Sequence, residues 1–146
     1  MEKERDFDLT KIDSEFGVLT QDKDCHLVTQ ELGLTPDRYH QKGEKTYSKF
    51  SPNPGIRQSG LWAVSKVSVG EDPRLSEHIK HFQNLLEGKI KIIEKLKKKD
   101  GFEFVLYVSV TTEYGAGGFD LSEEELSFIK TICDRFTYSF VTVKEV

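Results

Sequence analysis

The sequence contains few cysteines and prolines, and it has no long apolar segment. Its two cysteines, Cys25 and Cys133, lie far apart in apolar helical patterns, which favours reduced, buried thiols over a disulfide framework. A membrane-spanning helix needs about 20 consecutive apolar residues, and the polar first residues do not resemble a signal peptide. We therefore expect a cytoplasmic protein that has no membrane partner.

Recognisable catalytic and metal-binding patterns are also missing. Each cysteine has a potential base beside it, His26 or Asp134, but neighbouring side chains on a helix point apart, and a small buried residue is the favoured interpretation of each thiol. His78 and His81 are one helical turn apart, but two ligands do not make a zinc site. We therefore expect no catalytic residue, no metal and no cofactor, and we predict that the protein is not an enzyme.

The length and charge of the chain indicate one soluble domain. A chain of 146 residues with 36% hydrophobic content is long enough to bury roughly 70% of the surface that it exposes when unfolded. Its net charge of -4 gives no general attraction to nucleic acid or to anionic membranes. We predict a flexible N-terminal arm over residues 1–11 and a single α+β domain over residues 12–146.

Apolar and polar residues alternate in four segments, and this alternation predicts four strands. The predicted strands cover residues 16–20, 61–69, 102–111 and 136–143. The segment between Lys42 and Gly60 is rich in glycine and proline. We expect it to be mostly loop, with a short edge strand over residues 45–50.

Helical spacing of apolar residues predicts three helices. We expect Asp22 or Asp24 to cap the first helix and Gly33 to end it in a left-handed conformation. We expect Asp72 to cap the second helix, which Gly88 divides in two.

The last helix has the clearest start signal. Ser122 and Glu125 form a capping box, and Leu121 and Leu126 have the spacing of a hydrophobic staple. Its predicted buried face consists of Leu126, Ile129, Ile132 and Cys133. The order of elements predicts an α+β fold, namely a ferredoxin-like sandwich with a mixed or antiparallel sheet, helices mainly on one face, and an extra C-terminal helix–strand unit.

Several short motifs, in a fixed order, resemble those of an uncharacterised bacterial family. They are the helix end at 32–36, Lys42–Gly43, the strand at 60–65, the helix start at 75–78, and Leu121–Ser122. With these motifs the chain resembles domain of unknown function 4279 over roughly Phe16 to Val143. The resemblance implies an α+β domain and carries over no catalytic residue. The segment between Gly43 and Gly60 is longer than the resemblance leads us to expect.

A glycine-rich loop, residues 115–118, lies between a predicted strand and a predicted helix, where phosphate-binding loops occur. Its spacing does not match a nucleotide-binding fingerprint. Glu123, Glu124 and Glu125 occupy the first turn of the next helix and would repel an anion. A connector is the favoured interpretation, and whether this loop binds anything stays open.

Two segments are rich in basic residues. Lysines 89, 91, 95, 97, 98 and 99 are interpreted as the solvated face of a helix. Residues 39–57 differ because aromatic and basic side chains alternate there, and we take them as the candidate binding site: Tyr39, Lys42, Lys45, Tyr47, Lys49, Phe50 and Arg57. The alternative is that these aromatic side chains fold back onto the core.

Two functions of different classes remain. We favour a non-enzymatic bacterial protein-binding domain, for example an immunity or inhibitor protein whose partner is another protein. The alternative is a small nucleic-acid or nucleotide-binding module that uses the sheet face and the 39–57 loop. Exposed strand edges also make a homodimer possible.

Overall fold

The computed structural model describes residues 10–113 and 119–143. No helix in these two ranges is long and apolar enough to cross a membrane. The elements follow the chain in the order β1 (Thr10–Gln21), α1 (His26–Leu32), β2 (Arg38–His40), β3 (Lys45–Thr46), β4 (Gly55–Ile56), β5 (Gly60–Gly70), α2 (Leu75–Leu85), α3 (Ile90–Lys97), β6 (Glu103–Thr112), α4 (Glu123–Ile132) and β7 (Arg135–Thr142).

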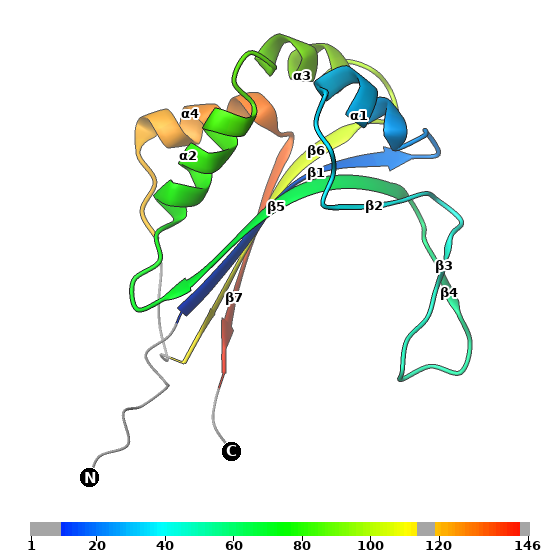
Figure 1. The fold of residues 1–146 in the computed structure, drawn as a ribbon, viewed down its shortest axis with the longest axis horizontal. Coiled ribbons are helices and arrows are strands. Elements are labelled where there is room, and N and C mark those ends of the chain that lie inside the picture. Colours follow the sequence, from blue (N-terminus) through cyan, green and yellow to red (C-terminus); the bar gives the residue numbers. More distant parts are fainter. Residues whose placement is uncertain (1–9, 114–118, 144–146) are drawn as a thin grey trace.

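Five strands form one mixed sheet in the order β2-β5-β1-β6-β7, and β3 pairs with β4 in a separate hairpin. The central strand β1 is antiparallel to both β5 and β6, whereas β7 runs parallel to β6. Figure 1 shows the helices gathered on one side of this sheet. The predicted α+β class, the mixed sheet and the placement of the helices are therefore confirmed.

The core lies between the helices and the strand residues that point toward them, with Phe16 at its centre. The ring centroid of Phe16 is 6.5 Å from that of Phe82 on α2 and 5.9 Å from that of Phe104 on β6. Trp62 of β5 is fully buried, and its indole N–H donates to Oγ1 of Thr29 on α1 at 2.9 Å. Large aromatic side chains thus join the three central strands to the helix layer.

Three predicted helix ends are confirmed. Gly33 ends α1 with φ of 67°, and Gly88, with φ of 76°, separates α2 from α3. Both angles lie in the left-handed region that favours glycine. At the start of α4, Ser122 Oγ accepts the Glu125 N–H at 3.1 Å and the Ser122 N–H donates to the Glu125 carboxylate at 2.9 Å.

Three predicted details of the helices are wrong. Cys25, and not Asp22 or Asp24, holds the N-cap position of α1, although Asp24 accepts the His26 N–H. Asp72 does not cap α2, because Arg74 holds the N-cap position and Asp72 instead forms an ion pair with it. Leu126 is 53% exposed, whereas Ile129 and Ile132 are buried as predicted. The spacing of Leu121 and Leu126 therefore does not bury Leu126, although Leu121 packs against the core.

The strands also differ from the prediction. β1 begins at Thr10, so Thr10 and Lys11, which we assigned to the N-terminal arm, pair with both β5 and β6; residues 1–9 lie outside the described ranges. The strand predicted over residues 45–50 comprises only Lys45–Thr46 and pairs with β4 and not with the main sheet. The edge strand β2 was not predicted, because three residues are too few for alternation to be recognised.

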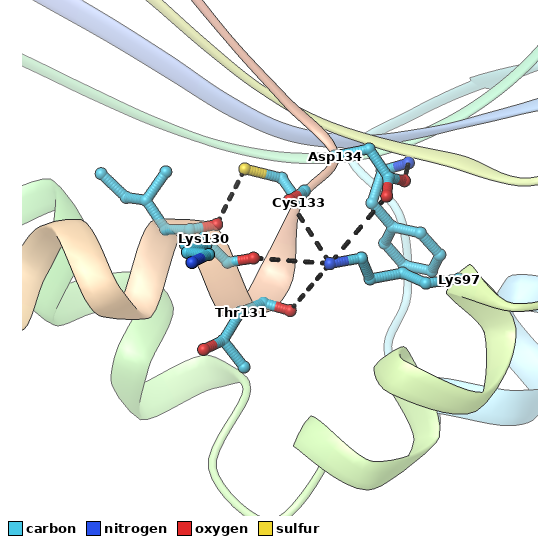
Figure 2. Close-up of polar contacts among 7 residues, drawn as sticks. Lys97, Lys130, Thr131, Cys133 and Asp134 are labelled. Carbon is cyan, nitrogen blue, oxygen red and sulfur yellow. Dashed lines mark hydrogen bonds and ion pairs between the residues drawn. The ribbon is translucent and has the colours of Figure 1, made fainter.

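Lys97, which we predicted to lie on a solvated face, instead joins α3 to the end of α4 (Figure 2). Its Nζ donates to the main-chain oxygens of Lys130, Thr131 and Cys133 at 3.4, 3.3 and 3.4 Å. A cation in this place interacts favourably with the helix dipole and with carbonyl groups that have no helical partner. Asp134, 3.9 Å from Nζ, accepts the Phe104 N–H at 2.9 Å, so the same contact region places the start of β7 beside β6.

We predict that Lys97→Met lowers the free energy of unfolding by about 1–2 kcal/mol, because methionine keeps the apolar stem but leaves the end of α4 without its cation. Lys95→Met is the matched control, since Lys95 lies in the same last turn but is exposed, and should change stability by less than about 0.5 kcal/mol. Urea unfolding of the three proteins measures both values. Equal losses in the two variants would show that Lys97 has no special role.

Candidate functional site

The hairpin formed by β3 and β4 projects from the edge of the sheet at β2, away from the helices (Figure 1). Each of its strands has two residues, with Lys45 opposite Ile56 and Thr46 opposite Gly55. Glu44 and Arg57 add main-chain bonds below them, with Arg57 N–H donating to Glu44 C=O at 2.8 Å. A Cβ at Gly55 would lie 2.6 Å from Thr46 Oγ1, so a larger residue at this position would require the Thr46 side chain to move.

The aromatic side chains of the hairpin point into solvent. Phe50 is 97% exposed and Tyr47 is 82% exposed, and both lie between the two short strands. The alternative interpretation, in which the loop aromatics fold back onto the core, is therefore wrong for these two residues. Tyr39 on β2 and Ile56 on β4 are also more than half exposed. The segment thus presents several large apolar side chains to the surroundings at one edge of the sheet.

The same segment is basic although the chain is acidic. Residues 38–60 contain five basic residues and one acidic residue, whereas the whole chain has a net charge of -4. Arg38 is paired with Glu15 at 2.6 Å. Within the described ranges, no ion pair is formed by Lys42, Lys45, Lys49 or Arg57, and all four are exposed. Their charges are therefore available to an acidic partner.

The N-terminal end of α1 holds the base of this segment. The ring of His26 lies beside that of Tyr39, with centroids 5.1 Å apart and the ring planes tilted by 59°. Asp24 accepts hydrogen bonds from the His26 N–H at 2.9 Å and from the Gln41 side chain at 2.7 Å. The structure therefore brings the predicted residue Tyr39 together with α1, while Tyr47 and Phe50 lie farther out on the hairpin.

Asp24, Cys25 and His26 place one possible ligand atom each within 4.8 Å of one another, so these neighbours lie closer than we expected. The arrangement does not activate the thiol. Burial, followed by the charge of Asp24, raises the pKa of Cys25 and keeps it protonated at neutral pH. Burial likewise raises the pKa of Cys133 to about 11. Neither thiol has the environment of a nucleophile.

A groove that we did not predict lies on the helix-free face of the sheet. It has a volume of about 640 Å³ and crosses β5, β1, β6 and β7. Asp13, Glu15 and Asp37 contribute carboxylates to its wall. Hydroxyl groups come from Ser65, Tyr107, Ser109, Thr137 and Ser139. The sequence signal for it is the polar half of the alternation in β1, β6 and β7, which by itself indicates an ordinary solvated face.

His78, one of the two histidines considered as metal ligands, is fully buried between α2 and the sheet. One ring nitrogen bonds to Ser14 Oγ and the other to Ser68 Oγ, at 2.6 Å for the latter. Burial, and then the charge of Lys66, lowers the pKa of His78 from 6.5 to about 4. Both nitrogens of the neutral ring are thus hydrogen-bonded, as expected of a histidine with a structural role.

The glycine-rich loop cannot be assessed in the same way, because residues 114–118 lie outside the described ranges. The three glutamates that we expected at the start of the following helix do occupy the first turn of α4.

Comparison with known proteins yields one match. A family model described as Domain of unknown function (DUF4279) matches residues 10–136. No curated protein and no solved structure matches the chain. The match covers the sheet from β1 to the start of β7 and includes the hairpin, so the candidate surface belongs to the matched domain.

We predict a loss of stability in mild acid that depends on His78. The unfolded chain binds a proton near pH 6.5 but the folded chain only near pH 4, so protonation favours unfolding between these values. Stability should therefore fall with decreasing pH by up to about 1.4 kcal/mol per pH unit from this group. His78→Gln should flatten the slope, whereas His26→Gln, at an exposed position, should keep it. Chemical unfolding at several pH values tests this, and identical slopes in all three proteins would contradict it.

Proposed function

The chain belongs to the DUF4279 family, and we propose that it acts as a non-enzymatic domain that binds another protein through the β3–β4 hairpin. The observation that carries this proposal is the near-complete exposure of Phe50 and Tyr47 on a basic, projecting hairpin. Tyrosine, phenylalanine and arginine are enriched at protein interfaces, where a few buried aromatic anchors supply most of the binding energy.

The chemistry of the hairpin indicates what kind of partner it fits. Phe50 requires an apolar pocket, and the unpaired cations Lys45, Lys49 and Arg57 favour an acidic rim around it. A projecting hairpin can enter a cleft that a flat surface cannot. This geometry suits an inhibitor or a bacterial immunity protein that occupies the cleft of its partner.

Nucleic-acid binding is the second candidate, because stacked aromatics and cations also suit single strands. The open sheet face argues against it. Asp13, Glu15 and Asp37 line the groove there together with one cation, Arg38, which pairs with Glu15. The net negative charge of these four groups would repel phosphates that follow the sheet. The protein partner is therefore preferred.

A non-enzymatic role is supported by the state of the candidate groups. Cys25 and Cys133 are buried thiols with raised pKa values, and His78 is a buried neutral histidine. None of the three combines access to solvent with an activating partner, which catalysis requires. Reduced buried thiols also agree with a cytoplasmic location.

We infer that the fold is a ferredoxin-like sandwich with an added α4–β7 unit. The argument is topological. β1 and β2 run in the same direction on either side of β5, and β5 and β6 do so on either side of β1. Each pair is connected through helix, so the two split βαβ units interlock as that fold requires.

We predict that Phe50→Ala or Tyr47→Ala weakens binding to the partner by at least about 10-fold, because each removes an anchor. The partner is first isolated on the tagged wild-type chain after nuclease treatment, identified, and then titrated calorimetrically. Both variants should keep the wild-type stability within about 0.5 kcal/mol, since the side chains are exposed.

Val69→Ala is the matched control, because Val69 is 60% exposed on β5 but lies outside the hairpin; it should bind as the wild type does. Capture that nuclease abolishes would favour the nucleic-acid candidate. Unchanged affinity in both hairpin variants would refute the role of the hairpin.

A further inference from the structure

The outer edge of β7 has no pairing partner among the described residues. β7 is the last strand in the sheet order, and on its inner side it pairs in parallel with β6. Six of its eight residues are exposed. Figure 1 shows β7 at the border of the sheet beside β6, opposite the edge that carries β2. An unpaired strand of this length offers a row of main-chain donors and acceptors to another strand.

The main-chain groups that point outward can be identified from the neighbouring bonds. Thr112 C=O of β6 accepts the Val143 N–H at 2.9 Å, and the Phe104 N–H is directed at Asp134, so the even positions of β6 face β7. In a parallel ladder the bonded positions alternate along each strand. On β7, Val143 and the other odd positions therefore face β6. The unpaired N–H and C=O groups of β7 belong to Phe136, Tyr138, Phe140 and Thr142.

The two edges of the sheet differ in how they are protected. At the other edge, β2 covers the first part of β5, and the Asp37 carboxylate accepts the Ser65 N–H at 2.8 Å just beyond it. On β7 the only charged residue is Arg135. Its guanidinium turns onto the sheet face, 3.3 Å from Glu103 and 3.5 Å from the Tyr107 hydroxyl. Exposed strand edges are usually protected by a proline or by an outward-pointing charge, and the β7 edge has neither.

We propose that β7 pairs with β7 of a second copy of this chain, antiparallel and with a two-fold axis through Ser139. This register uses every outward group: Phe136 lies opposite Thr142 of the other copy, and Tyr138 lies opposite Phe140. The odd residues form the closer pairs without hydrogen bonds, and Ser139 meets Ser139 on the axis. The two copies then share one continuous ten-stranded sheet with all helices on the same side.

The side chains fit this arrangement. Tyr138 is 36% exposed although it is aromatic, and on the helix side its ring lies 4.6 Å from that of Phe119. In the dimer Tyr138 gains an aromatic partner across each half of the interface, and such cross-strand pairs stabilise sheets. Arg135 falls opposite Val143, so no like charges face each other. The β7 edge is thus complementary to the same edge of a second copy, as two-fold symmetry requires.

The dimer goes beyond the proposed function because it does not involve the hairpin. β2 and the hairpin lie at the far edge of each sheet, so the dimer would carry one hairpin at each end. A partner with two copies of the recognised site would then be bound by both ends at once, with higher apparent affinity than a single hairpin gives.

Charge at position 139 tests the pairing. Sedimentation of the wild-type chain at micromolar concentration should give the mass of two chains. Ser139→Glu and Ser139→Lys, each alone, should give the mass of one chain because like charges meet on the axis. An equimolar mixture of the two variants should restore the mass of two. A monomeric wild type, or variants that stay dimeric, would overturn the proposal.

Cross-linking tests the register independently of these variants. Ser139→Cys should form a disulfide between chains under mild oxidation, because Cα atoms in a close antiparallel pair are within reach of one. Thr137→Cys is the matched control: in this register Thr137 lies opposite Val141, so it should not cross-link to its own copy. Cys25 and Cys133 are buried and give little background. Cross-linking through Thr137, or none through Ser139, would overturn the register.

Discussion

The alternation of side chains along β1 is the constraint on which the rest of the structure depends. β1 is paired on both sides almost throughout its length, so its register decides which residues of β5 and β6 face the helices. Phe16 and Val18 point to the core, while Asp13 and Glu15 point away. A slip of one residue would bury both carboxylates and expose Phe16, a large cost that holds the register in place.

A sheet with helices on one face has an open face and two edges, and here each of these surfaces has a different character. The open face carries carboxylates and hydroxyls in a shallow groove. The β2 edge is short and leads into the basic, aromatic hairpin, and the Asp37 carboxylate there accepts a main-chain N–H of β5. The β7 edge is long and carries no proline or outward-pointing charge. The proposed recognition surface and the proposed surface for strand pairing thus lie at opposite edges of the sheet.

The predictions from sequence succeeded where a local rule decides the structure. The capping box at Ser122, the left-handed glycines 33 and 88, and the alternation over residues 102–111 each depend on neighbouring residues alone. Three local predictions failed, the caps of α1 and α2 and the burial of Leu126. Other predictions failed because the partner lies far along the chain. Lys97 lies among other lysines, as a solvated lysine does. Only the packing of α3 against α4 directs its side chain to the end of α4.

The sequence by itself determined the class of the domain, the order of its longer elements, and the aromatic and basic residues of the 39–57 segment, because periodicity, capping and composition are local properties. Only the tertiary structure decided that Tyr47 and Phe50 point into solvent, that three carboxylates share a groove, and that β7 is an edge strand. Each of these depends on which strands are neighbours. The pairing of strands depends on the apolar surface that the whole sheet buries, and this total cannot be inferred from any single segment.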